Sequence, residues 1–593
     1  MNERTKTGLE ILQVAAILGV LGDVLLRATP WGLNVLLFNL AFAAGMIMLL
    51  RRRAPEYLTW QTSALFGALI FFASMFVWRD SPELRVADTF AIVAILSVLF
   101  LPRMKVAAQV ADVFHYGVAF LWSSLNAFFA PFVLIGTDIE WKSQARVGWA
   151  KHLFSALRGV IIVTPILLIF GGLFVAADAV YQGWVERVIN IPPETVVSHI
   201  LLFSLFSWLS AGYLRGVIIN TSVPVEITPE PETAQAKPNA SRVDGMHAEE
   251  GENSPNLANS LSILEHINIS DPPDVKEQEA EIQPAESVPE AKESKKKTWD
   301  WANIDNTIMP STFTLGAVEV GVILGLVNLL FLSFVIAQVP YLFGGMELVQ
   351  NTPDFKLAEY ASRGFGELVA VSALTLPMLL VGHWLIRKEN PFTEKLFRVL
   401  AAIQIALLFV IMASAAQRLF LLTGNLGYGL TTVRLYPMIF MTWLLIVFVW
   451  FGLTVLRGAR RHFAWGALWS AFFILAATHV LNPDAFIVRT NIALMQQGRE
   501  FDIEYNSTGL SADAIPDFVA AMSYLKAEGQ CYAKASLHRK FRELGDARGD
   551  LRSSNWSRML AWKALDENEP VIHQFDGCLP WVREHLLIDH NQN

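Results

Sequence analysis

The chain carries few charged residues for its length. Charged residues make up 17% of its 593 residues, hydrophobic residues make up 53%, and the mean hydropathy is +0.40. A typical soluble domain has about 25% charged residues. These values therefore exclude a soluble protein of ordinary composition and indicate a membrane protein.

The sequence also lacks the short motifs that mark common enzymes. It has no phosphate-binding loop with its lysine, no His-Glu-x-x-His motif, no Cys-x-x-Cys pair and no nucleophile elbow. Three of its histidines, His115, His152 and His199, lie too far apart in the sequence to suggest a metal site. We therefore favour a non-enzymatic function and expect neither a metal nor a cofactor.

Eleven apolar runs, by contrast, are long enough to cross a bilayer, since about 30 Å of hydrocarbon requires roughly 20 helical residues. They lie near residues 8–26, 32–50, 62–78, 86–101, 157–177, 197–219, 313–339, 365–386, 397–422, 435–456 and 463–481. The first run has no small-residue cleavage site, so we interpret it as an anchor. The sequence predicts an all-α, polytopic helical membrane protein.

One polar interval separates the first six runs from the last five. Residues 221–298 are rich in Glu, Pro and Ser and have no apolar periodicity, which predicts a disordered linker. Its first part, 221–294, holds sixteen acids against four Lys or Arg, so the linker accounts for the formal net charge of -8 and indicates no nucleic-acid partner. We predict transmembrane halves at 1–220 and 299–489 and a small helical module at 490–593.

Basic residues in short loops predict the orientation, because Lys and Arg concentrate on the cytoplasmic side of a membrane. Such loops contain Arg51 to Arg53, Arg103, Lys105, Arg387, Lys388, Lys395, Arg457, Arg460 and Arg461. A crossing by the apolar segment 110–134 would export the cations that follow it, so we predict an interfacial or re-entrant segment there. The N-terminus and the linker are then cytoplasmic, and the C-terminal module is extracytoplasmic.

The only two cysteines, Cys531 and Cys578, both lie in this predicted extracytoplasmic module. Disulfides persist in oxidising compartments and are rare in the cytosol. Their shared location favours a disulfide, and the alternative is two unrelated buried thiols.

Ionisable residues in the apolar runs require a partner or water, because each costs at least about 2.5 to 3.5 kcal/mol in hydrocarbon. Candidates are Glu319, Glu367, His383, Arg418 and His479. Glu359, Arg363 and Glu367 recur every four residues and so share one helix face. This stripe is either a ligand-binding surface or a self-neutralised ion pair at the membrane interface.

A Gly-rich hairpin between the ninth and tenth runs provides a second candidate binding group. Arg418 and Arg434 lie on either side of it, and Tyr428 lies within it. Such a loop could hold an anionic lipid headgroup or a small anionic ligand on the outer side. The alternative is a tight turn with interfacial Tyr and Arg anchors.

A third group surrounds the helix break after the last run. Pro483 cannot continue a helix but fits the first turn of a new one, which Asn482 is expected to cap. Asp484 would be stabilised near the start of that helix by its dipole. Arg489 would snorkel or meet an acid from another outer loop.

Four ordered motifs resemble a known family. They are "EYASRGFGEL" from 359, "RLFLLTGNLGYGLTTVRLY" from 418, "NPDAFIVRTNI" from 482 and "DIEYNSTGLSADAIP" from 502. Together with "RGVIIVTPILLIFGGLFVAADAVY" from 158, they resemble the bacterial membrane proteins called domain of unknown function 4173 and the related 4153. Ser362 and Thr490 depart from the family pattern. The resemblance implies a multi-pass protein of the cytoplasmic (inner) membrane and no established activity.

Three functions remain open from the sequence. The first is a non-enzymatic membrane protein in transport or envelope-associated sensing. The second is a lipid-linked transferase at the outer leaflet, with Asp23 or Asp80 as the acid and Arg418 or Arg434 holding an anionic carrier. The third is a scaffold whose linker recruits a cytoplasmic protein.

The predicted topology can be tested with alkaline phosphatase, which is active only when exported. A fusion after residue 500 should be active and a fusion after residue 260 inactive, because the basic loops place these positions on opposite sides. Equal expression of both fusions is the control. Activity at 260 without activity at 500 would overturn the orientation.

Overall fold

The computed structural model describes residues 3–141, 193–219, 314–343, 365–386, 391–420, 423, 429–546, 549–574 and 578. All of them belong to one compact unit. Within these ranges, eleven helices are long and apolar enough to cross a membrane, which confirms the all-α polytopic class. The predicted span at 157–177 and the predicted linker at 221–298 lie outside the described residues.

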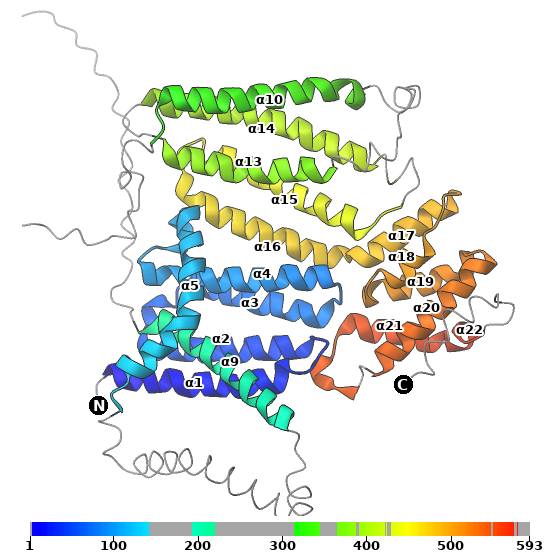
Figure 1. Cartoon of the computed structure of the whole chain (residues 1–593), viewed down its shortest axis with the longest axis horizontal. Coiled ribbons are helices and arrows are strands. Elements are labelled where there is room, and N and C mark those ends of the chain that lie inside the picture. The colour runs from blue at the N-terminus through cyan, green and yellow to red at the C-terminus, as the bar shows by residue number, and fades with distance from the viewer. Residues whose placement is uncertain are drawn as a thin grey trace, which may run out of the picture. The chain divides into compact units, whose positions relative to one another are not determined.

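Five of the helices that the structure describes in the first half run back and forth in Figure 1: α1 (Glu3–Leu26), α2 (Leu33–Arg53), α3 (Trp60–Trp78), α4 (Pro82–Val98) and α9 (Pro193–Ile218). Local signals set two of their starts. The Thr59 hydroxyl caps α3 by accepting from the Thr62 amide at 3.3 Å, and Pro82 occupies the first turn of α4.

The second half contains α10 (Ala317–Phe343), α13 (Phe365–Leu385), α14 (Pro391–Phe420), α15 (Thr432–Thr454) and α16 (Phe463–Leu481). Phe397, Phe448 and Phe451 are fully buried in its core. The two halves meet where α16 lies beside α4, and the rings of Phe72 and Phe472 have centroids 5.1 Å apart.

The two ends of this bundle differ in character. We name the end where α1 begins the basic end, because α2 finishes there in Arg51, Arg52 and Arg53 and α4 is followed there by Arg103. The opposite end carries the C-terminal helices, and we name it the module end (Figure 1).

Helix α5 (Val113–Val133) runs along the basic end. Asp112 before it lies 3.8 Å from Arg460, and Asp138 after it pairs with Arg4 at 2.7 Å and Arg215 at 2.6 Å. All three arginines belong to the basic end, so α5 does not connect the two ends, although Val113–Asp138 is long and apolar enough to span a membrane. Figure 1 shows it lying crosswise to α1 to α4.

The described part of the C-terminal module contains α17 (Pro483–Gln496), α18 (Ile503–Thr508), α19 (Ile515–Ala521), α20 (Ala527–Asp546), α21 (Trp556–Glu567) and α22 (Glu569–Ile572). Its core contains Ile487 and Phe518 and also Leu430, which precedes α15. The module therefore begins at the helix break, before the predicted boundary at 490. In the structure, Cys531 and Cys578 form a disulfide, with Cα atoms 5.5 Å apart.

Candidate functional site at the module junction

The Asp513 carboxylate of the module binds the turn between α3 and α4. Asp513 Oδ2 accepts hydrogen bonds from the backbone amides of Asp80 at 2.7 Å and Ser81 at 3.0 Å. Asp513 lies in the short 3-10 helix Ala512–Ala514, which begins where the Ser511 hydroxyl accepts from the Asp513 amide at 3.2 Å. A bundle turn and a module turn are thus joined directly.

Arg79 adds a second connection, which reaches the last transmembrane helix. Its Nε donates to the His479 carbonyl at 2.9 Å, and its Nη1 lies 3.3 Å from Asp513 Oδ1. The guanidinium also stacks 4.4 Å above the centre of the Trp78 ring. One side chain therefore links the ends of α3 and α16 to the module.

The module also satisfies the free carbonyls at the end of α3, which a helix cannot bond internally. Asn555 Nδ2 donates to the carbonyls of Phe76 and Arg79, both at 2.8 Å, and the Ser557 hydroxyl donates to that of Trp78 at 2.8 Å. The close fit extends to Gly32, where an added Cβ would lie 2.4 Å from the Ser554 carbonyl oxygen.

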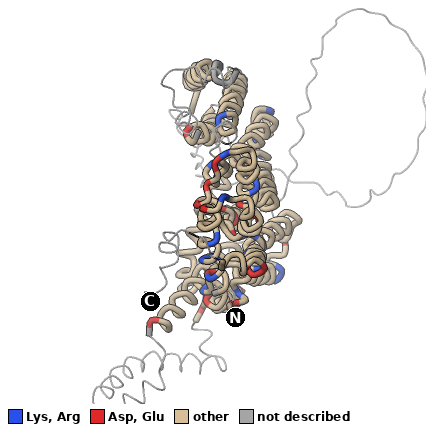
Figure 2. The backbone as a smooth tube through the Cα atoms, turned by 90° about the vertical axis from the view of Figure 1, so that its right-hand side faces the viewer, with Lys and Arg blue, Asp and Glu red and all other residues tan. Residues whose placement is uncertain are grey.

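Two further carboxylates lie at this junction, the partly buried Asp80 and the buried Asp484. Asp80 pairs with Arg85 and lies 3.3 Å from Arg558 Nε. Burial raises the pKa of Asp80, although both arginines act to lower it. Figure 2 looks onto the module end, where acidic and basic residues are interspersed.

The second of these carboxylates, Asp484, has a hydrogen-bond partner for only one of its two oxygens among the described residues. Its side chain accepts from the Ser511 amide at 3.1 Å and the Ser511 hydroxyl at 2.5 Å, but its Oδ1 is buried without a hydrogen-bond partner among the described residues. Burial raises the pKa of Asp484 to about 6, and the nearby charges of Asp513 and Glu83 act in the same direction.

Asp88 and His479 form a buried pair inside the bundle. His479 Nε2 and Asp88 Oδ1 are 2.9 Å apart, and these residues are 0% and 1% exposed. Neither His479 Nδ1 nor Asp88 Oδ2 has a hydrogen-bond partner in the described part of the chain. Because an unmade buried hydrogen bond costs about 1 to 3 kcal/mol, this pair is an unusual feature for a purely structural core.

The structure describes only three residues of the first two predicted binding groups, Glu367, Arg418 and Arg434. Glu359, Arg363 and Tyr428 lie outside the described residues. Arg418 is 8% exposed and donates to Gln338 Oε1 at 2.5 Å, Arg434 donates to the Gly429 carbonyl, and Glu367 is exposed on α13. None of the ion pairs between described residues involves Glu367.

The helix break has a different local structure from the predicted one. Pro483 does begin α17, but Asn482 makes no side-chain capping bond, so that prediction is wrong. Asn482 instead adopts a left-handed conformation with φ 54° and ψ 78°, which Asn tolerates better than most residues. Asp484 is bonded to Ser511, and Arg489 Nε pairs with Asp517 of α19 at 3.0 Å.

Residues from three of the family-like motifs meet in one hydrogen-bonded cluster. The Asn491 side chain accepts from the Leu430 amide at 2.6 Å and donates to the Leu430 carbonyl and to Asn506 Oδ1, both at 3.0 Å. The Tyr505 hydroxyl accepts from the Thr432 amide at 2.7 Å. Gly429, with φ 70°, passes so close that an added Cβ would lie 2.9 Å from Asn491 Oδ1. These motifs join the module to the start of α15.

Comparison with known protein families agrees with the family resemblance of these motifs. Residues 66–249 and 288–521, more than half of the chain, match the family model described as Domain of unknown function (DUF4153). The chain belongs to this family. We found no match among curated proteins or solved structures. The DUF4153 match includes Arg79, Asp80, Asp88, His479 and Asp513, whereas Asn555, Ser557 and Arg558 lie beyond it.

Sequence reasoning selected His479 and Asp484 but missed their main neighbours. Asp88 lies inside the apolar run 86–101 and could have been found by the rule that selected His479. Asp513 lies within a quoted motif, but its contacts join positions more than 400 residues apart, which no local pattern shows. Within the described residues, no group of His, Cys, Asp or Glu could hold a metal ion.

The raised pKa predicts how Asp484 affects stability. The folded state holds the Asp484 proton up to about pH 6, whereas the unfolded chain releases it near 3.8, so this residue reduces stability as pH rises from about 4 to 6. Asp484→Asn removes this effect. Relative to wild type, the variant should gain on the order of 3 kcal/mol between pH 4 and 7, measured by unfolding the full-length protein in detergent.

Asp517→Asn is the control for this experiment, because it changes a more exposed carboxylate on the same module. A difference between Asp484→Asn and wild type that does not change with pH would contradict the assignment.

Proposed function

We propose that this DUF4153 protein resides in the bacterial cytoplasmic membrane, with its basic end in the cytoplasm and its module outside. The arginines at the ends of α2, α4 and α15 support this orientation, since such loops favour the cytoplasm. On this orientation, α5 lies in the cytoplasmic interface, because both of its ends contact basic-end residues.

Within that membrane, we propose a non-enzymatic role in envelope-associated sensing. The observation that carries this proposal is Arg79, which contacts both the His479 carbonyl of α16 and Asp513 of the module. A ligand or force that shifts the module would act on α3 and α16 through this contact. Asp484 and Asp80, whose charged forms are disfavoured at the junction, would make the response depend on external pH.

The contacts of the candidate residues do not support the transferase alternative. Asp23 pairs with Arg27 at 2.6 Å and with His199 at 2.5 Å, and Asp80 pairs with Arg85. These acids do not converge with Arg418 or Arg434 on a shared opening in the described residues. The scaffold alternative depends on the linker, which lies outside them.

Transport is the second candidate, and one observation favours it. The buried pair of Asp88 and His479 places two titratable groups inside the bundle, each with an unbonded polar atom. Intramembrane Asp and His residues are typical of proton and substrate pathways.

Complementation of a deletion strain, screened for envelope-stress phenotypes, tests the sensing proposal. Asp513→Asn should fail to rescue at normal protein abundance, because it removes the charge that binds Arg79 and replaces an acceptor facing two amides with a group that also donates. Asp517→Asn is the matched control. It lies four residues later and pairs with Arg489, and it should rescue fully.

Asp88→Asn in the same assay separates sensing from transport. Rescue by Asp513→Asn with loss of rescue by Asp88→Asn would favour transport. Full rescue by both variants at normal abundance would contradict both functions. If Asp513→Asn lowers abundance, the Arg79→Gln, Asp513→Asn double variant removes both charges together, and rescue by it at normal abundance also counts against sensing.

A further inference from the structure

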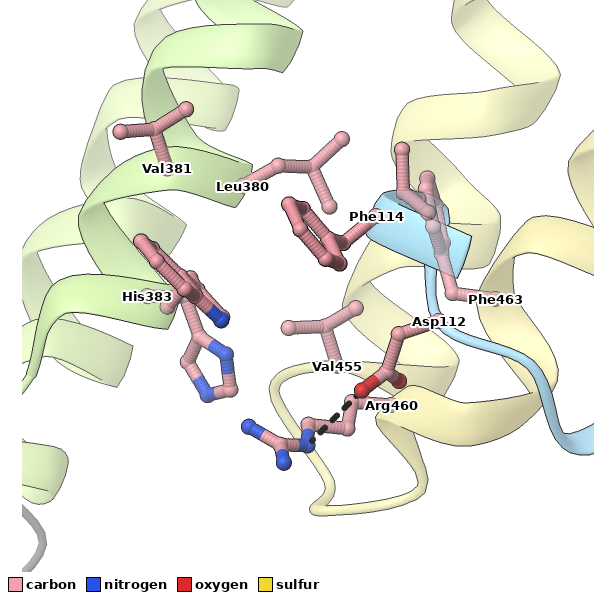
Figure 3. A pocket seen from close by; sticks show the side chains of 10 residues that line it. Asp112, Phe114, Leu380, Val381, His383, Val455, Arg460 and Phe463 are labelled. Atoms are coloured by element: carbon pink, nitrogen blue, oxygen red, sulfur yellow. Dashed lines mark ion pairs between the residues drawn. The ribbon is translucent and has the colours of Figure 1, made fainter. Parts of the chain in front are cut away.

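A cavity of about 290 Å³ lies at the basic end, between helices from both halves of the bundle. Figure 3 shows Leu380, Val381 and His383 of α13 on one side and Phe114 of α5 and Phe463 of α16 on the other. The Phe114 ring stacks on Trp384, with centroids 6.0 Å apart and planes at 10°. Helix α5 thus forms one wall of a largely apolar cavity.

The polar groups of this cavity are confined to part of its lining. Arg460 and Asp112 lie together there, joined by the dashed line in Figure 3, with Nε and Oδ2 3.8 Å apart. His383 lies nearby in the same view, and the remaining labelled side chains are apolar. The cavity therefore has the amphipathic lining that a lipid requires, with a polar region for the headgroup and an apolar region for a chain.

Several arginines of the described residues lie around the polar region. The loop 457–462 contains Arg457, Arg460 and Arg461 and no acid. Arg398 also reaches this loop, since its Nη2 lies 3.5 Å from where a Cβ on Gly458 would be. Among the described residues, the acids that pair with these arginines are Asp112, beside Arg460, and Glu394, beside Arg398.

Two apolar residues that line the cavity are exposed at the surface of the bundle. Val381 is 54% exposed and Phe114 is 44% exposed, and both line it. Val381 belongs to a helix that is long and apolar enough to span the membrane. Exposed apolar residues of such a helix face lipid chains, so the occupant of the cavity comes from the bilayer.

We propose that this cavity binds a phospholipid with an anionic headgroup, independently of the sensing or transport function. One acyl chain lies between Phe114 and the α13 residues Leu380 and Val381. The phosphate is held near Arg460 and the other arginines of the loop. Anionic lipids gain affinity from each nearby Lys or Arg, whereas a zwitterionic lipid gains only from chain burial.

Thermal unfolding of delipidated full-length protein in a neutral detergent tests this site. Phosphatidylglycerol should raise the melting temperature saturably, with half-saturation at roughly a tenfold or more lower mole fraction than phosphatidylethanolamine, as expected when one or two arginines lie near the phosphate. Inorganic phosphate alone should have no comparable effect. Val381→Trp, which fills the cavity, should abolish the saturable shift.

Leu374→Trp is the matched control, because it adds the same bulk two turns earlier on the same face of α13, where Leu374 is 69% exposed. Its response to phosphatidylglycerol should match wild type. Arg460→Gln leaves the apolar lining intact and should reduce the preference for the anionic lipid, so the proposal remains testable if Val381→Trp fails to fold.

Three results would overturn the proposal. Equal shifts with the two lipids would exclude headgroup recognition. An equal loss of the shift in Leu374→Trp and Val381→Trp would exclude this cavity as the site. A saturable shift with inorganic phosphate that matches the lipid would identify a free anion as the ligand.

Discussion

The structure depends on how the α3–α4 turn is bonded to the C-terminal module. A helix that ends leaves backbone carbonyls without partners, and the start of the next helix leaves amides without partners. Asn555 and Ser557 bond the carbonyls of α3, and Asp513 bonds the amides of Asp80 and Ser81. The module therefore completes the bundle, and separating the two would expose polar groups on both sides of the junction.

This dependence explains why titratable residues gather at the junction. The contact with the module buries Asp484 and Asp513 and partly buries Asp80. Burial disfavours the charged forms of Asp80 and Asp484. Arg79 extends the same network to the carbonyl of His479, whose ring pairs with Asp88 inside the bundle. A change in the position of the module, or in the protonation of the junction carboxylates, would thus occur next to the pair of Asp88 and His479. This is the one buried Asp–His pair among the described residues. This proximity is the physical basis of the proposed sensing function.

Sequence patterns were sufficient for the parts of the fold that depend on local periodicity and charge. The described spans match helices, and both ends of α5 lie at the basic end. The candidate binding groups could not be predicted in the same way, because local spacing does not show which distant residues become neighbours. Arg418 and Arg434 are close in sequence, yet Arg418 bonds Gln338 of another helix. No sequence pattern singles out Asp513, which bonds the amides of Asp80 and Ser81. Asn482 was assigned a common capping role, but the direction of the chain after α16 requires a left-handed residue there.

Hydrogen exchange at the Asp80 and Ser81 amides tests most directly whether Asp513 joins the module to the bundle. Full-length wild-type protein in lipid nanodiscs should protect both amides, since each donates to Asp513. Asp513→Ala should accelerate their exchange by roughly tenfold or more, equivalent to about 1.4 kcal/mol, while amides in the middle of α3 remain unchanged. Equal exchange of both amides in the variant and the wild type would contradict the account.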